Sequence, residues 1–221
     1  MATREDTFVE VAIDTSLILH LPTGANAGSG WTAEEVTGTA IQRVDAANDY
    51  CESSADEGND RHLYTLQPDP AGVEYDVQAT LSGIAGSPSL PWFLIARLTD
   101  ASNYYSAGSY NAGSAADKKI FKKVAGTVAE IASGDNGLTA GDTIKFEVRD
   151  AAKKLFHNGS EIISSADNAL TSAGRAGFGV GNAWVATDDI EQDWKSDNFF
   201  YTEVAAAASA AKRRMMLGVG L

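Results

Sequence analysis

Short strands separated by turn residues, from Trp92 to Phe200, constrain the fold of this chain more than any other feature. The segment from Asp142 to Arg149 alternates apolar and polar residues, which is typical of a half-buried strand. Between Lys154 and Ile163, the pair Asn158-Gly159 separates two apolar arms. Asn-Gly favours the positive φ angles of a two-residue hairpin turn, and helix periodicity is almost absent. The pattern predicts an all-β, two-sheet antiparallel sandwich.

The rest of the chain extends this pattern and ends in a segment of different character. Further strands are expected at Phe8–Ile13, Gly38–Val44, Arg61–Leu66 and Val73–Leu81, with a polar loop over residues 46–60. A length of 221 residues suits one large all-β domain. We therefore predict a sandwich domain over residues 1–203 and a separate tail over residues 204–221.

The charge of the chain argues against two classes of partner. The net charge is −13, whereas a duplex-binding protein needs a basic face that displaces counterions from phosphates. No stretch of about 20 apolar residues is present, and the charged N-terminal segment has no apolar signal-peptide core. We expect no nucleic acid and no membrane as partners, and synthesis in the cytoplasm without a signal peptide.

The tail has the composition of an assembly segment. An alanine run after Val204 is followed by basic and then apolar residues. Such a terminus is ordered only when a partner holds it. The residues predicted to dock into a neighbouring protein are Arg213, Arg214, Met215, Met216, Leu217 and Val219.

Several motifs resemble one family. Near the start, Leu17-x-x-His20-x-Pro22 and a glycine loop precede Trp31. Later motifs are Arg97-x-x-Asp100-x-x-Asn103-Tyr-Tyr105, Ser172-x-Gly174-Arg-x-Gly177 and Asp197-Asn-Phe199. Together they resemble the concanavalin A-like (laminin G-like) jelly rolls of phage and bacterial proteins, over roughly residues 5–203. The Arg-Arg-Met-x-Leu-Gly-Val-Gly ending is similar to the C-termini of some phage structural proteins.

The resemblance implies a jelly-roll β-sandwich and favours a non-enzymatic role. We expect a structural or decorating component of a phage-like particle, in the capsid or the tail, localised to the virion and contacting host-surface glycans. Its partners would be other virion proteins, or further copies bound through the tail. Two alternatives stay open, a free carbohydrate-binding lectin-like module and a glycoside hydrolase, because the fold alone does not determine function.

Aromatic and amide side chains supply the candidate glycan site. Sugars stack on exposed aromatic faces, and adjacent residues on a strand point to opposite faces. One of Tyr104 and Tyr105 should therefore face outward. The candidate ligand-binding residues are Trp92, Asn103, Tyr104, Tyr105 and Tyr110.

Catalytic and metal sites receive less support. Asp189, Glu191 and Asp193 would share one face of a strand, as an acidic pair of a glycanase would, but their order and position differ from those enzymes. The three histidines lack ligand spacing, so we expect no metal cofactor; a structural calcium held by Asp193 or Asp197 is the alternative. Cys51 lacks a neighbouring group that would activate it as a nucleophile.

Overall fold

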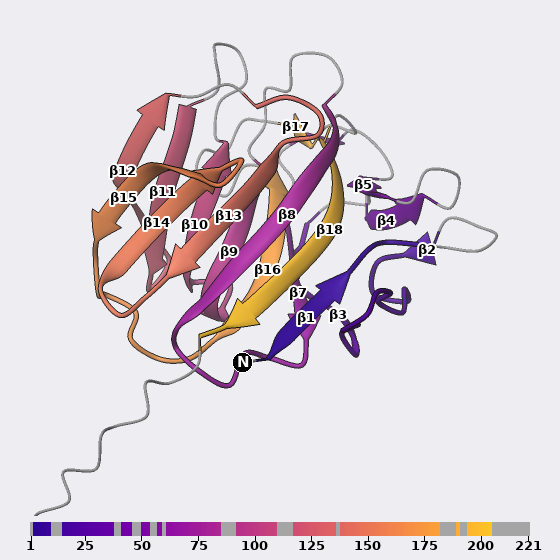
Figure 1. The fold of residues 1–221 in the computed structure, drawn as a ribbon, viewed down its shortest axis with the longest axis horizontal. Helices are drawn as coiled ribbons and strands as arrows, with labels where there is room; N and C mark the ends of the chain where they lie inside the picture. The colour runs from indigo at the N-terminus through magenta and orange to yellow at the C-terminus, as the bar shows by residue number, and fades with distance from the viewer. Residues whose placement is uncertain are drawn as a thin grey trace, which may run out of the picture.

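The computed structural model consists of two antiparallel sheets packed face to face (Figure 1). It describes residues 2–9, 15–37, 41–45, 50–53, 57–58, 61–84, 92–109, 117–135, 138–181, 189–190 and 194–204. These residues form strands and turns and contain no helix, so none of them forms an apolar helix long enough to cross a bilayer. The predicted two-sheet antiparallel sandwich is confirmed. The tail beyond Val204 lies outside the described residues, and the boundary at residue 203 stays a prediction.

The larger sheet has the order β15-β14-β13-β8-β18-β5-β4-β2, and β1 also pairs with β18. Its strands are β1 (Thr3–Asp6), β2 (Thr15–Ser16), β4 (Gln42–Asp45), β5 (Tyr50–Ser53), β8 (Tyr75–Ile84), β13 (Thr143–Val148), β14 (Ala152–His157), β15 (Ser160–Ala166) and β18 (Trp194–Glu203). This sheet lies at the front in Figure 1.

The second sheet lies behind it and has the order β12-β11-β10-β9-β16-β7-β3. Its strands are β3 (Gly30–Val36), β7 (Arg61–Gln67), β9 (Trp92–Asp100), β10 (Asn103–Ser109), β11 (Asp117–Val124), β12 (Thr127–Asp135) and β16 (Arg175–Gly181). A separate small pair joins β6 (Glu57–Gly58) to β17 (Asp189–Ile190).

The core lies between the sheets and follows the alternation in the sequence. In the larger sheet, Val77 pairs with Phe146 on one side and Tyr201 on the other. In the second sheet, Phe178 pairs with Leu94 and Tyr64. All are buried, and burial stabilises by about 25 cal/mol per Å² of apolar surface removed from water.

The Asn158-Gly159 hairpin is confirmed. Asn158 has φ +48° and Gly159 has φ +80°, the positive angles that a two-residue type I′ turn requires. Asn158 also accepts a hydrogen bond from Thr143 N through Oδ1 (2.8 Å) and donates one from Nδ2 to Asp142 (2.7 Å). The turn residue therefore fastens the hairpin to the start of β13.

Three local expectations were wrong. The segment predicted as a loop contains β5, whose Cys51 faces the core while Glu52 pairs with Arg43 on β4 (2.8 Å). Within the strand predicted at Gly38–Val44, Ile41 is not in a strand and β4 begins at Gln42. The first described strand is Thr3–Asp6, which is set by its pairing with β18; of the predicted opening strand Phe8–Ile13, Phe8 and Val9 are not in a strand and residues 10–13 lie outside the described residues.

A buried carboxylate anchors the N-terminal segment. Asp6 is fully buried, and its Oδ1 accepts hydrogen bonds from Phe8 N (2.8 Å), His20 Nε2 (2.9 Å) and Thr23 N (3.2 Å). Its Oδ2 accepts one from Trp31 Nε1 (2.6 Å). The His20 and Trp31 motif residues therefore meet on one acid, and we refer to this group as the Asp6 cluster.

Candidate functional site

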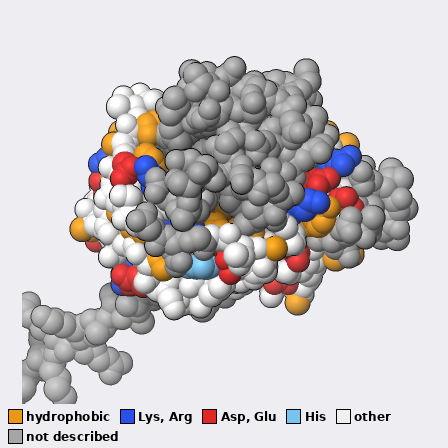
Figure 2. All heavy atoms as spheres, turned by 90° about the horizontal axis from the view of Figure 1, so that it is seen from above, with side chains coloured by type: hydrophobic (Ala, Val, Ile, Leu, Met, Phe, Trp, Pro, Cys, Tyr) orange, Lys and Arg blue, Asp and Glu red, His pale blue; other side chains and the backbone are white. Residues whose placement is uncertain are grey.

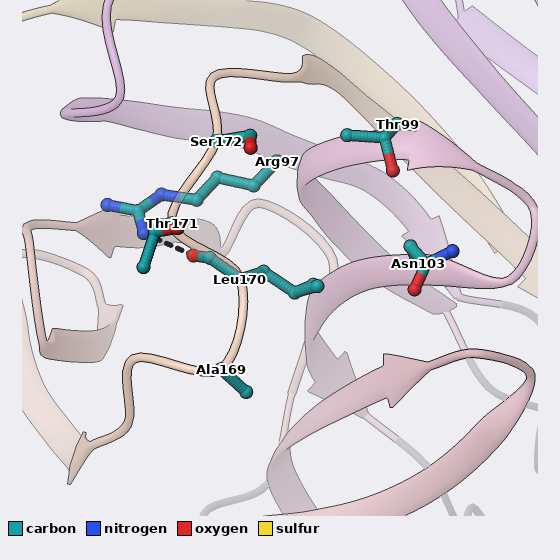
Figure 3. A pocket seen from close by; sticks show the side chains of 7 residues that line it. All are labelled: Arg97, Thr99, Asn103, Ala169, Leu170, Thr171 and Ser172. Atoms are coloured by element: carbon teal, nitrogen blue, oxygen red, sulfur yellow. Dashed lines mark hydrogen bonds between the residues drawn. The ribbon is translucent and has the colours of Figure 1, made fainter.

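A surface pocket of about 180 Å³ lies where the β9–β10 hairpin meets the loop between β15 and β16. Figure 3 shows its lining, which comes from two segments far apart in the sequence. The hairpin supplies Arg97, Thr99 and Asn103, and the loop supplies Ala169, Leu170, Thr171 and Ser172. We call residues 167–174 the pocket loop.

Arg97 lies in a β-bulge at the base of the pocket. Its φ is +52°, and the register with both neighbouring strands shifts beside it. A bulge re-aims a side chain out of the sheet alternation. Arg97 thus points inward, where Nε donates to Val73 O (3.0 Å) and Nη1 donates to Leu170 O (2.6 Å). The Tyr75 hydroxyl accepts the hydrogen bond from Arg97 N that the bulge removes from the ladder.

Asp167 fixes the start of the pocket loop. Its Oδ1 accepts hydrogen bonds from the Tyr105 hydroxyl (2.6 Å) and from Ala169 N (3.0 Å), and its Oδ2 accepts one from Lys122 Nζ. Leu170 N donates to the same Tyr105 hydroxyl (3.1 Å). Burial alone would raise the pKa of Asp167, but the donors Lys122 and Tyr105 outweigh it and lower that pKa below its usual value.

Lys153 holds the loop from beneath. Its fully buried ammonium donates to three main-chain carbonyls, those of Asp150 (2.7 Å), Asp167 (2.9 Å) and Arg149 (3.2 Å). The ammonium therefore fastens the pocket loop to the β13–β14 turn. Burial, reinforced by the positive charge of Arg97, lowers the pKa of Lys153 to about 8.

Asn103 fixes the opposite wall of the pocket. Its Nδ2 donates to both carboxylate oxygens of Asp100 (3.0 Å each), and its Oδ1 accepts a hydrogen bond from Ala125 N (2.9 Å). The hydrogen bond from Asn103 is the largest influence on Asp100, and it lowers the pKa of that carboxyl. Asn103, predicted as a ligand contact, thus lines the pocket while its amide shapes the hairpin.

Three hydroxyls remain available to a ligand. Thr99, Thr171 and Ser172 are exposed, and within the described part of the chain their side chains make no hydrogen bond. The backbone that carries Thr171 and Ser172 is fixed by Asp167, Arg97 and Lys153. The arrangement offers free donors and acceptors on a rigid support, which is what recognition of a hydroxylated ligand needs.

The predicted aromatic platform was wrong for three of its members. Trp92, Tyr104 and Tyr105 are all fully buried. Trp92 Nε1 instead donates to Ser196 Oγ between the sheets (2.7 Å).

Tyr104 and Tyr105 do face opposite sides of their strand, as expected, but neither is exposed. Tyr104 packs in an apolar cluster on the outer face of β9 and β10, together with Leu63, Phe93, Ile95 and Leu98. Tyr105 lies in the main core, and its hydroxyl anchors the pocket loop. Tyr110 lies outside the described residues.

The candidate acidic and metal residues are placed only in part. Asp189 lies on β17, whereas Glu191 and Asp193 lie outside the described residues. Asp197 accepts hydrogen bonds from Asn198 N (2.6 Å) and Nδ2 (2.8 Å). In the described segments, no group of three His, Cys, Asp or Glu side chains is placed to hold a metal ion. Burial raises the pKa of the Cys51 thiol, and residues 205–221 of the tail are not described.

The sequence prediction missed most of the pocket. Thr99, Thr171, Lys153 and Asp167 were not selected at all. The available signal was the pair of family-like motifs that contain Arg97 and Ser172, because the structure brings these two motifs together at the pocket.

Comparison with known proteins identifies the fold. No family model and no curated protein sequence matches the chain. Among solved structures, the Ca²⁺/Man2-bound VIP36 exoplasmic/lumenal domain matches with a TM-score of 0.59 and 8% identity, covering 91% of each chain. A Bacillus subtilis protein of unknown function with a galectin-like fold matches with a TM-score of 0.58 and 13% identity, covering 90% of this chain and 99% of that one. The carbohydrate binding module CBM66 from Bacillus subtilis matches with a TM-score of 0.54 and 17% identity, covering 77% of this chain and 96% of that one.

These similarities span most of each chain at low sequence identity, so they define the architecture rather than the ligand. The expected jelly-roll fold is confirmed. The chain has the concanavalin A-like, galectin-like β-sandwich fold.

Proposed function

We propose that this protein is a non-catalytic carbohydrate-binding module whose ligand enters the pocket beside Arg97. Two of the similar structures carry names that denote carbohydrate binding or a bound mannose ligand, which favours this function over the virion role expected first. The observation that carries the proposal is the set of three available hydroxyls, those of Thr99, Thr171 and Ser172, in one pocket.

The pocket loop is rigid before any ligand arrives. Hydrogen bonds from Lys122, Lys153 and Arg97 fix it at two of its residues, Asp167 and Leu170. A ligand that binds a preorganised loop avoids the entropic cost of ordering it. Leu170 adds an apolar surface against which the C–H face of a sugar ring packs.

The lining favours binding over hydrolysis. Glycoside hydrolysis commonly uses two carboxyl groups that flank the scissile bond. None of the seven residues that line the pocket is acidic. The volume of about 180 Å³ is below the roughly 300–1,000 Å³ of sites for drug-sized ligands, so it suits a single terminal sugar unit.

A glycan array followed by titration of hits in ¹H–¹⁵N NMR spectra tests this function. The double variant Thr99→Ala/Ser172→Ala should weaken binding about 10-fold or more, since each lost hydrogen bond is worth about 0.5–1.5 kcal/mol. Its matched control is Thr32→Ala/Ser82→Ala, which alters two exposed hydroxyl residues outside the pocket. Equal loss in both variants, or ligand-induced shifts that avoid the pocket loop, would refute the assignment.

The particle role expected from the sequence remains a separate proposal. It rests on the tail after Val204, which lies outside the described residues. Light scattering of the full chain and of a version ending at Glu203 tests it. Assembly of the full chain alone would support a virion component, whereas two equally monomeric proteins would remove the case for it.

A further inference from the structure

Two buried cations, Arg97 and Lys153, lie at the pocket end; Asp167 and Asp150 attract Lys153, and its Nζ lies 4.7 Å from the centre of the Tyr105 ring. Arg97 is 1% exposed and Lys153 is fully buried. Within the described residues neither forms an ion pair, and the side-chain hydrogen bonds of both go to main-chain carbonyls. One guanidinium nitrogen of Arg97, Nη2, is buried and has no hydrogen-bond partner there.

Several other cations of the molecule form ion pairs. Arg43 pairs with Glu52, Arg149 with Asp76, and Arg175 with Glu34. On the opposite end of the sandwich, Figure 2 shows described acidic and basic side chains lying next to one another. Arg97 and Lys153 therefore differ from these pairs, in a chain whose net charge is −13.

Burying these two cations without an ion pair costs free energy. A buried charge loses its hydration, and the cost is offset only by a counter-charge and full hydrogen bonding. Arg97 also repels Lys153, which contributes to the lowered pKa of that lysine. Asp167, one of the two acids that attract Lys153, already accepts hydrogen bonds from Lys122 and Tyr105. An anion beside Arg97 would offset both costs.

The pocket borders Arg97, so an anion held in the pocket would lie near this buried guanidinium. Arg97 is one of the residues that line the pocket. In Figure 3 its side chain crosses behind the pocket loop, and its guanidinium lies beside Thr171 at the pocket wall. In the same view Ser172 lies near the stem of Arg97 and Thr99 lies across from the guanidinium, on the hairpin side; these are the hydroxyls that would contact a sugar ring.

We propose that the pocket selects a sugar that carries a carboxylate, of the uronic acid class. The carboxylate lies toward Arg97 and Thr171, and the ring hydroxyls contact Thr99 and Ser172. This inference rests on the proposed carbohydrate-binding function and adds the charge of the ligand to it. The positive potential of Lys153 supports the same orientation from beneath the loop.

Calorimetry and ¹H–¹⁵N NMR with four probes test the inference. The probes are methyl β-glucuronide, methyl galacturonide, the neutral methyl β-glucoside and acetate. We expect at least one uronide to bind about 10-fold more tightly than the glucoside, with amide shifts at residues 97–99 and 169–172. Binding should weaken between about 20 and 200 mM salt, because added ions screen the attraction.

One exposed position gives a matched pair of variants. Thr171→Asp places a carboxylate beside Arg97 and should reduce uronide affinity about 10-fold or more. Thr171→Asn has nearly the same size without the charge and should reduce it about 3-fold or less. Ser82→Asp adds the same charge elsewhere and should change nothing. Because Thr171 is exposed, all three variants should fold.

The outcomes separate this inference from the function beneath it. Equal binding of glucoside and uronide at the pocket would overturn the proposed selection for a carboxylate but retain the carbohydrate-binding function. Acetate binding as tightly as the uronides would show that the pocket is a simple anion site and would overturn the proposal that its ligand is a sugar. Equal losses in Thr171→Asp and Thr171→Asn would remove Arg97 from recognition. No binding of any sugar, here or on the array, would overturn both proposals.

Discussion

The Asp6 cluster and the Arg97–Lys153 group both tie an irregular segment to the sandwich, yet they differ in how completely their polar atoms are hydrogen-bonded. Asp6 accepts four hydrogen bonds, from His20, Trp31 and two backbone amides. Arg97 and Lys153 are also buried, but their side chains donate only to main-chain carbonyls, and Arg97 Nη2 has no hydrogen-bond partner among the described residues. The carboxylate is fully hydrogen-bonded, whereas the guanidinium is not.

The contrast separates a structural role from a functional one. A buried polar group that is fully bonded stabilises its surroundings, whereas an unmatched charge destabilises them. Local departures from good pairing concentrate at functional sites. We therefore interpret the Asp6 cluster as a structural anchor and the Arg97–Lys153 group as part of a binding site.

The largest expected effect is the loss of the structural anchor. Asp6→Ala leaves His20, Trp31 and two buried amides without their acceptor. We expect the free energy of unfolding to fall by about 3–5 kcal/mol, measured by urea denaturation. Asp69→Asn, at an exposed position, is the control and should cost less than about 0.5 kcal/mol. A loss below about 1 kcal/mol for Asp6→Ala would contradict the structural interpretation.

Removing Lys153 should affect stability less and binding more. Lys153→Met removes the ammonium donor from three part-buried carbonyls but also removes a buried charge, so we expect a loss of about 1–2 kcal/mol. Hydrogen exchange at Ala169 and Leu170 should accelerate, and uronide affinity should fall about 10-fold.

The neighbouring lysine provides the control for that variant. Lys154 is partly exposed and pairs with Glu161 (2.7 Å), so Lys154→Met should leave the stability nearly unchanged, because solvent screens an exposed pair. Unchanged exchange in the pocket loop of Lys153→Met would show that the ammonium does not fix it.

The pH dependence sharpens the contrast further. The pKa of Lys153 is about 8 in the folded protein, below its ordinary value of 10.5. Between these values the unfolded chain binds more protons, so stability should rise with pH. We expect wild type to gain about 1 kcal/mol relative to Lys153→Met between pH 7.5 and about 10.

Uronide affinity should move in the opposite direction over that range, because the attracting charge is lost. The charged groups that face Lys153 are Arg97, Asp167 and Asp150, and the pKa of Asp167 is lowered further from this range by its hydrogen bonds from Lys122 and Tyr105. Stability and affinity that rise together would refute the proposed role of the ammonium.

The sequence predicted the scaffold better than the site, for identifiable reasons. The alternation of apolar and polar residues fixes which residues of Tyr75–Ile84 face the core. The pair Asn158-Gly159 determines the hairpin turn locally, through its positive φ angles. The burial of Tyr104 depends instead on an outer-face cluster that distant strands supply.

The lysines of β14 show the same limit. The sequence places Lys153 and Lys154 side by side without indicating which one faces inward. The distinction arises only when three carbonyls from two other segments meet the inward one. Sites assembled from separate loops carry little local signal, because each loop shows only its own turn residues.

A carboxylate near the surface provides the smallest test of the comparison. Asp142 accepts hydrogen bonds from Asn158 Nδ2 (2.7 Å) and Thr139 N (2.6 Å), and His157 Nε2 lies 2.9 Å from it. Burial opposes its ionisation, but these donors lower its pKa to about 2, from an ordinary value of 3.8. Its contribution to stability is therefore complete above about pH 4 and is lost as the pH falls through about 2.

Asp142→Asn should cost about 1 kcal/mol or less at pH 5, because solvent screens a group so near the surface. The difference from wild type should disappear by pH 2, as measured by urea unfolding at both pH values. A cost that persists unchanged at pH 2 would show that Asp142 acts through shape rather than charge. Asp142 would then stabilise the fold in a different way from Asp6. The degree of hydrogen bonding alone would not distinguish structural clusters from the pocket.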